Sequence, residues 1–249
     1  MIVHSEIPAV DRYLANGYLD VLGMSSRFAA AIAAATMRIQ SENGIAGHFA
    51  EIGTFEGRFF IALAHALQPG ERAIGVDHFE WPDAGVLDRF KRNLAHHGPK
   101  DARAIVLKAD SRGLTRDTLL GGASGHVRFF HIDGEHTADH LSKDLALAHA
   151  AIDAKGIICL DDMLHPGYPT LGLTVDQYLR AHPEMRVFCV IDREDIVAAA
   201  KFMICRTDMT DFYTEALTRA FQPFVWPLGA DFRDYHALVL APEPKLAKI

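Results

Sequence analysis

Two adjacent aspartates, Asp161 and Asp162, end the apolar run GIICLDD, and a third, Asp133, ends the earlier run VRFFHID. Carboxylates held close together repel one another unless a cation lies between them. Oxygen ligands without cysteine or clustered imidazole suit Mg²⁺, or alternatively Mn²⁺ or Ca²⁺. The three acids therefore predict a divalent-metal site. The alternative is that Asp161 and Asp162 only form the turn into the following His-Pro-Gly, and that Asp133 is an ordinary loop residue.

A second group of polar residues follows three earlier apolar runs. The first run ends in EIGTFEG, where Gly53 and Gly57 allow a tight turn and a close approach of a ligand to the backbone. The second ends at Asp77, which can accept hydrogen bonds from both hydroxyls of a ribose, and the third ends at Asp110-Ser111, within reach of an adenine. The spacing G-x-x-x-G lacks the third glycine of the nicotinamide-dinucleotide fingerprint. Together these positions predict an adenosine-bearing cofactor, with a turn or helix-cap role as the alternative for each residue alone.

The pattern of apolar residues predicts the elements that hold these groups. Short apolar runs indicate strands, and apolar residues spaced by three and four indicate helices. We expect strands at residues 47–53, 72–77, 103–110, 127–133 and 156–161, and helices at 59–67, 86–98 and 138–152. After residue 185 the rhythm changes, and we expect strands at 185–192, 201–206 and 235–241 and a helix at 211–221.

Repeated strand–helix–strand units with apolar strands are typical of a parallel sheet covered by helices on both faces. We therefore expect an α/β fold, Rossmann-like and doubly wound. The strands at 185–192 and 201–206 are joined by a segment too short for a helical crossover, so they should pair antiparallel. Residues 1–44 are expected to form an alanine-rich helical extension, and residues 45–249 one domain. Ligands of such sheets bind at the carboxyl ends of the strands, where the acids and glycines fall.

The three strand ends resemble the cofactor motifs of class I S-adenosylmethionine-dependent methyltransferases, over roughly residues 45–206. The resemblance implies that family's mostly parallel seven-stranded sheet with an antiparallel strand near the C-terminus. It also implies which residues surround S-adenosylmethionine: Glu51, Gly53, Thr54 and Gly57 at the methionine part, Asp77 at the ribose, Asp110 and Ser111 near the adenine, and Asp133 beside the cofactor. His78 and Trp81 follow Asp77 in the chain, and their position alone suggests that they flank the adenine.

The run IDGEHTADHLSKDLALA followed by KGIICLDD is similar to metal-dependent O-methyltransferases of the catechol and caffeoyl type. It is more similar still to the branch that contains macrolide-sugar O-methyltransferases and cephalosporin-hydroxylase-like proteins. By this resemblance Asp133, Asp161 and Asp162 hold the metal, although the family has asparagine at the position of Asp162. His136 stands where the catechol type has a lysine that takes the proton from the attacking hydroxyl. His136 and Asp133 are therefore the implied catalytic residues, and a neutral imidazole near pH 7 suits the role of base.

The resemblance implies an S-adenosylmethionine-dependent, divalent-metal-dependent O-methyltransferase acting on a hydroxyl of a small molecule of the sugar or natural-product type. Two alternatives stay open, because a fold alone does not fix a function. One is an oxidoreductase or hydroxylase that keeps the fold and the metal. The other is a non-catalytic nucleotide-binding protein.

Composition narrows the class of partner. The chain has 249 residues and a net charge of −7, which argues against a nucleic-acid or anionic-membrane surface. The N-terminus lacks the pattern of a signal peptide, and the apolar run at 28–37 is too short to cross a bilayer. Cys159, Cys189 and Cys205 each lie in an apolar run, as expected of buried thiols in a reducing compartment. We expect a cytoplasmic enzyme with a small-molecule substrate; whether it forms a homo-oligomer is left open.

Overall fold

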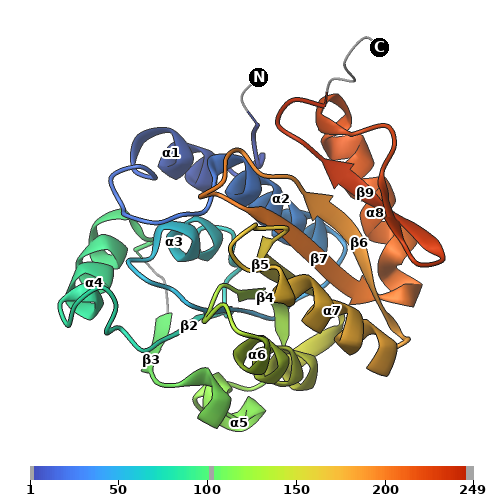
Figure 1. Ribbon diagram of the computed structural model, residues 1–249. Helices are drawn as coiled ribbons and strands as arrows, with labels where there is room; N and C mark the ends of the chain where they lie inside the picture. Colours follow the sequence, from blue (N-terminus) through green and yellow to red (C-terminus); the bar gives the residue numbers. More distant parts are fainter. Residues whose placement is uncertain (1–2, 101–103, 245–249) are drawn as a thin grey trace.

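One continuous sheet organises the chain, of which the computed structural model describes residues 3–100 and 104–244. The strand order is β3-β2-β1-β4-β5-β7-β6-β9-β8 (Figure 1). The strands are β1 (His48–Ile52), β2 (Ala73–Asp77), β3 (Ala104–Lys108), β4 (Val127–Ile132), β5 (Ile152–Met163), β6 (Met185–Ile191), β7 (Ala200–Arg206), β8 (Ala230–Phe232) and β9 (Tyr235–Leu240). Strands β1 to β5 pair in parallel, whereas β7 runs antiparallel to both β5 and β6.

The predicted α/β fold and the antiparallel pair of β6 and β7 are confirmed, with differences in detail. The sheet in the described residues has nine strands rather than seven, because β9 adds parallel to β6 and β8 adds antiparallel to β9. Strand β5 is longer than expected and runs through both aspartates to Met163. The first residue of the strand predicted at 103–110 lies outside the described residues.

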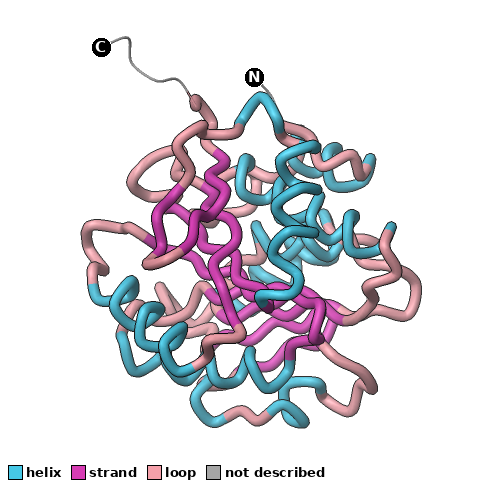
Figure 2. The backbone as a smooth tube through the Cα atoms, turned by 90° about the vertical axis from the view of Figure 1, so that its right-hand side faces the viewer, coloured by secondary structure: helices cyan, strands magenta, loops and turns pink. Residues whose placement is uncertain are grey.

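Helices cover both faces of the sheet (Figures 1 and 2). They are α1 (Pro8–Asn16), α2 (Arg27–Glu42), α3 (Arg58–Ala64), α4 (Val86–His97), α5 (Arg116–Leu120), α6 (Ala138–Ala151), α7 (Thr170–Ala181) and α8 (Thr210–Ala220). Apolar residues of α1 to α4 and α8 form one core cluster, and those of α5 to α7 form the other. Helix α7 lies in a segment for which no element was predicted. None of the helices within residues 3–100 and 104–244 is long and apolar enough to cross a membrane.

The alanine-rich helix α2 lies in the interior. Residues 28–37 are all buried, because the small alanine side chains let this helix pack closely on the sheet. The Ser26 side chain caps the helix by accepting a hydrogen bond from the Ala29 amide at 3.0 Å. The predicted N-terminal extension is helical and shares a core cluster with α3 and α8, and the division of the chain at residue 44 stays a prediction.

Helix α6 determines where the segment after β4 is held. The Thr137 side chain accepts a hydrogen bond from the His140 amide and so caps the first turn. Leu141, Leu145 and Ala148 are buried at helical spacing and pack on the sheet. The loop of residues 133–136 is therefore fixed between the end of β4 and the start of α6, at the carboxyl edge of the sheet.

Candidate active site

A cavity of about 590 Å³ opens at the carboxyl ends of β1, β2, β4 and β5. The strand order reverses between β1 and β4, and crevices at such a reversal are the usual ligand sites of open α/β sheets. One wall comes from residues 22–25 of the N-terminal segment. Residues 133–136, the end of β5 and the loop that follows it also line the cavity.

The cavity gathers most of the residues predicted for the cofactor, namely Glu51, Gly53, Thr54, Asp77, His78, Trp81, Ser111 and Asp133. Asp77 also fixes the turns around it, because its carboxylate accepts the amide hydrogens of Phe55 at 2.8 Å and Phe79 at 2.6 Å. Two predicted residues do not line the described cavity. Gly57 begins α3 with its α-carbon facing Phe90, and Asp110 pairs with Arg112 at 2.7 Å.

The buried carboxyl group of Glu51 has one oxygen bound and one open. Oε1 lies 2.7 Å from Nδ1 of His131, whereas Oε2 has no partner among the described residues, and neither has the buried hydroxyl of Thr54. Burial raises the pKa of Glu51 well above its ordinary value, and Lys201 only partly opposes this. Buried polar atoms are rarely left without a partner. These two atoms indicate that a polar ligand completes this part of the cavity.

Gly53 is required by the close packing of two strand ends. Its φ is +84°, and a Cβ at this position would lie 1.7 Å from the carbonyl oxygen of Asp133. The amide of Asp133 donates to the carbonyl of Ile52 at 2.8 Å, so the ends of β1 and β4 meet backbone to backbone. Any side chain at residue 53 must therefore push Asp133 away from the cavity wall.

Gly53→Ala is expected to lower the free energy of unfolding by more than the 1–2 kcal/mol or so that a left-handed alanine costs by itself. Gly70→Ala is the matched control, because Gly70 also has a positive φ (+92°) but nothing lies within 4 Å of its Cβ position. Urea unfolding of both variants isolates the contribution of the contact with Asp133. Equal losses in the two variants would contradict the packing role.

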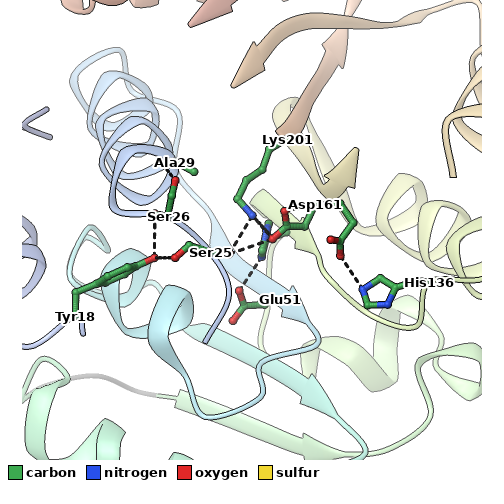
Figure 3. Close-up of polar contacts among 10 residues, drawn as sticks. Tyr18, Ser25, Ser26, Ala29, Glu51, His136, Asp161 and Lys201 are labelled. Carbon is green, nitrogen blue, oxygen red and sulfur yellow. Dashed lines mark hydrogen bonds and ion pairs between the residues drawn. The ribbon is translucent and has the colours of Figure 1, made fainter. Parts of the chain in front are cut away.

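The three predicted metal ligands all line the cavity, and the two adjacent ones, Asp161 and Asp162, have separate partners. Figure 3 shows the contacts of Asp161. A register irregularity between Leu160 and Met163 and a left-handed φ of 58° at Asp162 let the adjacent carboxylates diverge. Asp161 is buried, pairs with the ammonium group of Lys201 and accepts a hydrogen bond from Ser25 Oγ at 3.0 Å. Each acid of the pair therefore has its own partner, which limits their mutual repulsion.

Asp162 and Tyr168 hold the imidazole of His136. Its Nε2 lies 2.7 Å from Oδ2 of Asp162, and its ring stacks on Tyr168 with centroids 4.0 Å apart. Burial lowers the pKa of His136, but the hydrogen bond and charge of Asp162 outweigh it, so the pKa is raised above 6.5. With Nε2–H donating to Asp162, a tautomer assigned from this contact, Nδ1 is left as a proton acceptor.

The described donor atoms place the three aspartates in two sets rather than one, and the three-aspartate metal site stays a prediction. Among the described residues, two sets have ligand atoms within 4.8 Å of one another: Asp133, His136 and Asp162, and His131, Asp133 and Asp161. The second set contains Asp161, whose carboxylate is already paired with a lysine. Burial, and next the charge of Asp161, raises the pKa of Asp133 well above its ordinary value. A single Mg²⁺ held by all three aspartates does not fit this arrangement.

The buried cation of this site is a lysine that was not predicted from the sequence. Lys201 is 1% exposed and lies in β7, within the apolar stretch AKFMICR. A signal was present, because lysine is almost never fully buried without a partner. His131 and Ser25, which also belong to this network, carry no motif that would have distinguished them.

Comparisons with known proteins agree on a methyltransferase architecture. Residues 50–163 match the family model of a methyltransferase domain. Among curated proteins, no sequence matches this chain. The fold is similar to that of CalS11, a TDP-rhamnose 3'-O-methyltransferase of calicheamicin biosynthesis, with a TM-score of 0.57 and 17% identity over 80% of this chain and 91% of that chain. It is also similar to that of TomG, an O-methyltransferase of tomaymycin synthesis from Streptomyces achromogenes, with a TM-score of 0.57 and 18% identity over 81% and 91%. The family model thus indicates a methyltransferase domain at residues 50–163, and the solved structures show a similar fold.

Proposed function

This chain carries a methyltransferase domain at residues 50–163, and we propose that it is an S-adenosylmethionine-dependent O-methyltransferase acting on a hydroxyl of a small sugar or natural product. The observation that carries the proposal is that the Gly53–Thr54 turn and Asp77 line the same cavity as the pair of His136 and Asp162. The names of CalS11 and TomG support a small-molecule acceptor.

The described residues fit an S-adenosylmethionine molecule, which supplies an electrophilic methyl group when bound. The open Oε2 of Glu51 and the open hydroxyl of Thr54 suit the polar methionine part. Asp77 suits the ribose, since each of its oxygens keeps acceptor capacity beside its backbone hydrogen bond. Ser111 and His78 line the side proposed for the adenine.

His136 is the proposed general base. It lines the cavity, Asp162 fixes its orientation, and a free ring nitrogen can take the proton from an acceptor hydroxyl. Removing that proton makes the oxygen a stronger nucleophile as it approaches the methyl group. The walls hold the acceptor in line with that group, and such positioning is the main requirement of a displacement reaction.

The metal-dependent form of the same activity is the second candidate. It is favoured by the convergence of Asp133, His136 and Asp162, which would hold a divalent ion that lowers the pKa of a bound hydroxyl. In that case His136 would be a ligand and could not act as the base.

S-Adenosylmethionine at 100 times its Kd should stabilise the protein by about 2.7 kcal/mol. For a chain of this length that corresponds to a rise in melting temperature of roughly 5–11 °C. Asp77→Ala should remove most of this rise, because it deletes the proposed ribose acceptor. Differential scanning fluorimetry measures the rise in melting temperature of wild type and of Asp77→Ala. The control is Asp83→Ala, which removes an exposed aspartate near the start of α4.

Release of S-adenosylhomocysteine with a panel of hydroxylated acceptors tests the reaction itself. A rise in melting temperature with NAD⁺ and none with S-adenosylmethionine would favour the oxidoreductase alternative. Cofactor binding without methyl transfer to any acceptor would favour a non-catalytic nucleotide-binding protein.

A further inference from the structure

The ammonium group of Lys201 lies among donor atoms that could otherwise hold a metal ion. His131, Asp133 and Asp161 have ligand atoms within 4.8 Å of one another. Nζ of Lys201 lies 3.2 Å from Nε2 of His131 and is hydrogen-bonded to Oδ2 of Asp161 (Figure 3). The chain therefore supplies its own cation to this set of donors.

The hydrogen bonds around Lys201 are mutually consistent. The ammonium group also donates to Ser25 Oγ at 3.1 Å, so each of its three hydrogens has a partner. Because Nε2 of His131 accepts from Lys201, the proton of this imidazole is on Nδ1, which donates to Glu51 at 2.7 Å.

We propose that Lys201 is the resident cation of this active site and that it balances the charge of Asp161 in place of a divalent ion, so that the reaction proceeds without metal. The metal-free reaction rests on the proposed methyltransferase function, whereas the balancing of the Asp161 charge by Lys201 does not. Lys201 is a positioning residue. It does not line the described cavity, but its partners Asp161 and Ser25 do.

The same ammonium group ties the N-terminal segment to the sheet. Ser25 Oγ donates to Asp161 at 3.0 Å and accepts from Lys201. The hydroxyl of Tyr18 donates to the carbonyls of Ser25 and Ser26, each at 3.0 Å, which fixes the segment that forms one wall of the cavity. A metal ion bound at Asp161 would have to displace the ammonium group and break its contact with Ser25.

Titration of metal-stripped protein with Mn²⁺, with the free ion followed by electron paramagnetic resonance, tests the charge-balancing role. Wild type and Lys201→Arg should have no tight site. Lys201→Met should gain a tight site, with an affinity for Mn²⁺ at least about 10-fold higher than that of wild type. The reason is that two carboxylates and an imidazole lose the fixed positive charge beside them. Mn²⁺ should also raise the melting temperature of Lys201→Met alone. Lys108→Met, in which a half-exposed lysine of β3 is removed, should behave as wild type.

Lys201→Met leaves a buried carboxylate unpaired, so a second variant is needed in case it fails to fold. Lys201→Met/Asp161→Asn removes both charges, and it should fold and bind no Mn²⁺. Mn²⁺ binding by this double variant as tight as that of Lys201→Met would overturn the proposal. So would a tight Mn²⁺ site in wild type that is lost in Asp133→Asn or Asp162→Asn.

Chelation separates this inference from the proposed function. If wild type releases S-adenosylhomocysteine equally well with and without a chelator, the metal-free reaction is supported. Activity that is lost on chelation and restored by Mg²⁺ would refute it. If no acceptor yields S-adenosylhomocysteine under any condition, the proposed function fails, and the Mn²⁺ titrations still decide the role of Lys201.

Discussion

Replacing His136 with alanine is expected to lower the turnover number by about 10²–10⁴-fold, the usual contribution of a positioned general base. The affinity for S-adenosylmethionine should change little, because its proposed contacts come from the ends of other strands. Steady-state release of S-adenosylhomocysteine measures the first quantity, and isothermal titration calorimetry measures the second.

The pH dependence of the rate distinguishes a base from a merely structural histidine. Only the neutral imidazole accepts a proton, so turnover should fall as the pH drops through the raised pKa of His136. Asp162→Asn removes the main group that raises this pKa, and it should move the acid limb of the profile to lower pH. His140→Ala is the control, since His140 also lines the cavity but contacts Thr137 instead. Normal turnover of His136→Ala would mean that His136 is not the base.

Arg128→Met should lower the free energy of unfolding by about 3–5 kcal/mol, the usual cost of breaking a buried ion pair from one side. Arg128 is fully buried and pairs with Glu71 at 2.7 Å. It also donates to the carbonyl of Met37 at 2.6 Å and to Gln40 at 3.1 Å, and so joins the last turns of α2 to the start of β4. Methionine replaces only the aliphatic part of the side chain and satisfies none of these acceptors.

Urea unfolding of Arg128→Met is best compared with that of Arg116→Met. Arg116 pairs with an exposed aspartate at 3.3 Å, and its loss should change stability by no more than about 0.5 kcal/mol. The double variant Arg128→Met/Glu71→Gln should recover part of the loss, because the buried carboxylate is then neutral. If Arg128→Met lowers the free energy of unfolding by less than about 1 kcal/mol, water must replace the guanidinium group. That result would contradict the burial of Arg128 in the structure.

The repeating pattern of apolar runs was sufficient to predict the fold class. Buried parallel strands read as near-continuous apolar runs, and helices such as α6 show their buried residues at a spacing of three and four. Helix α7 and strand β8 were not predicted. Helix α7 follows a turn-rich segment without a side-chain cap, and β8 has only three residues, so neither has a strong local signal.

The amino-acid sequence by itself determined that acids and glycines stand at the ends of successive strands, since that order follows from the chain alone. It also indicated that the acids near Asp161 need a positive charge beside them. Only the tertiary structure decided which charge that is. Strand β7 enters the sheet antiparallel beside β5 and brings Lys201 against Asp161, a contact between residues that are far apart in the chain. Local patterns report which face of an element is buried, but the partner of a buried charge depends on which strands become neighbours.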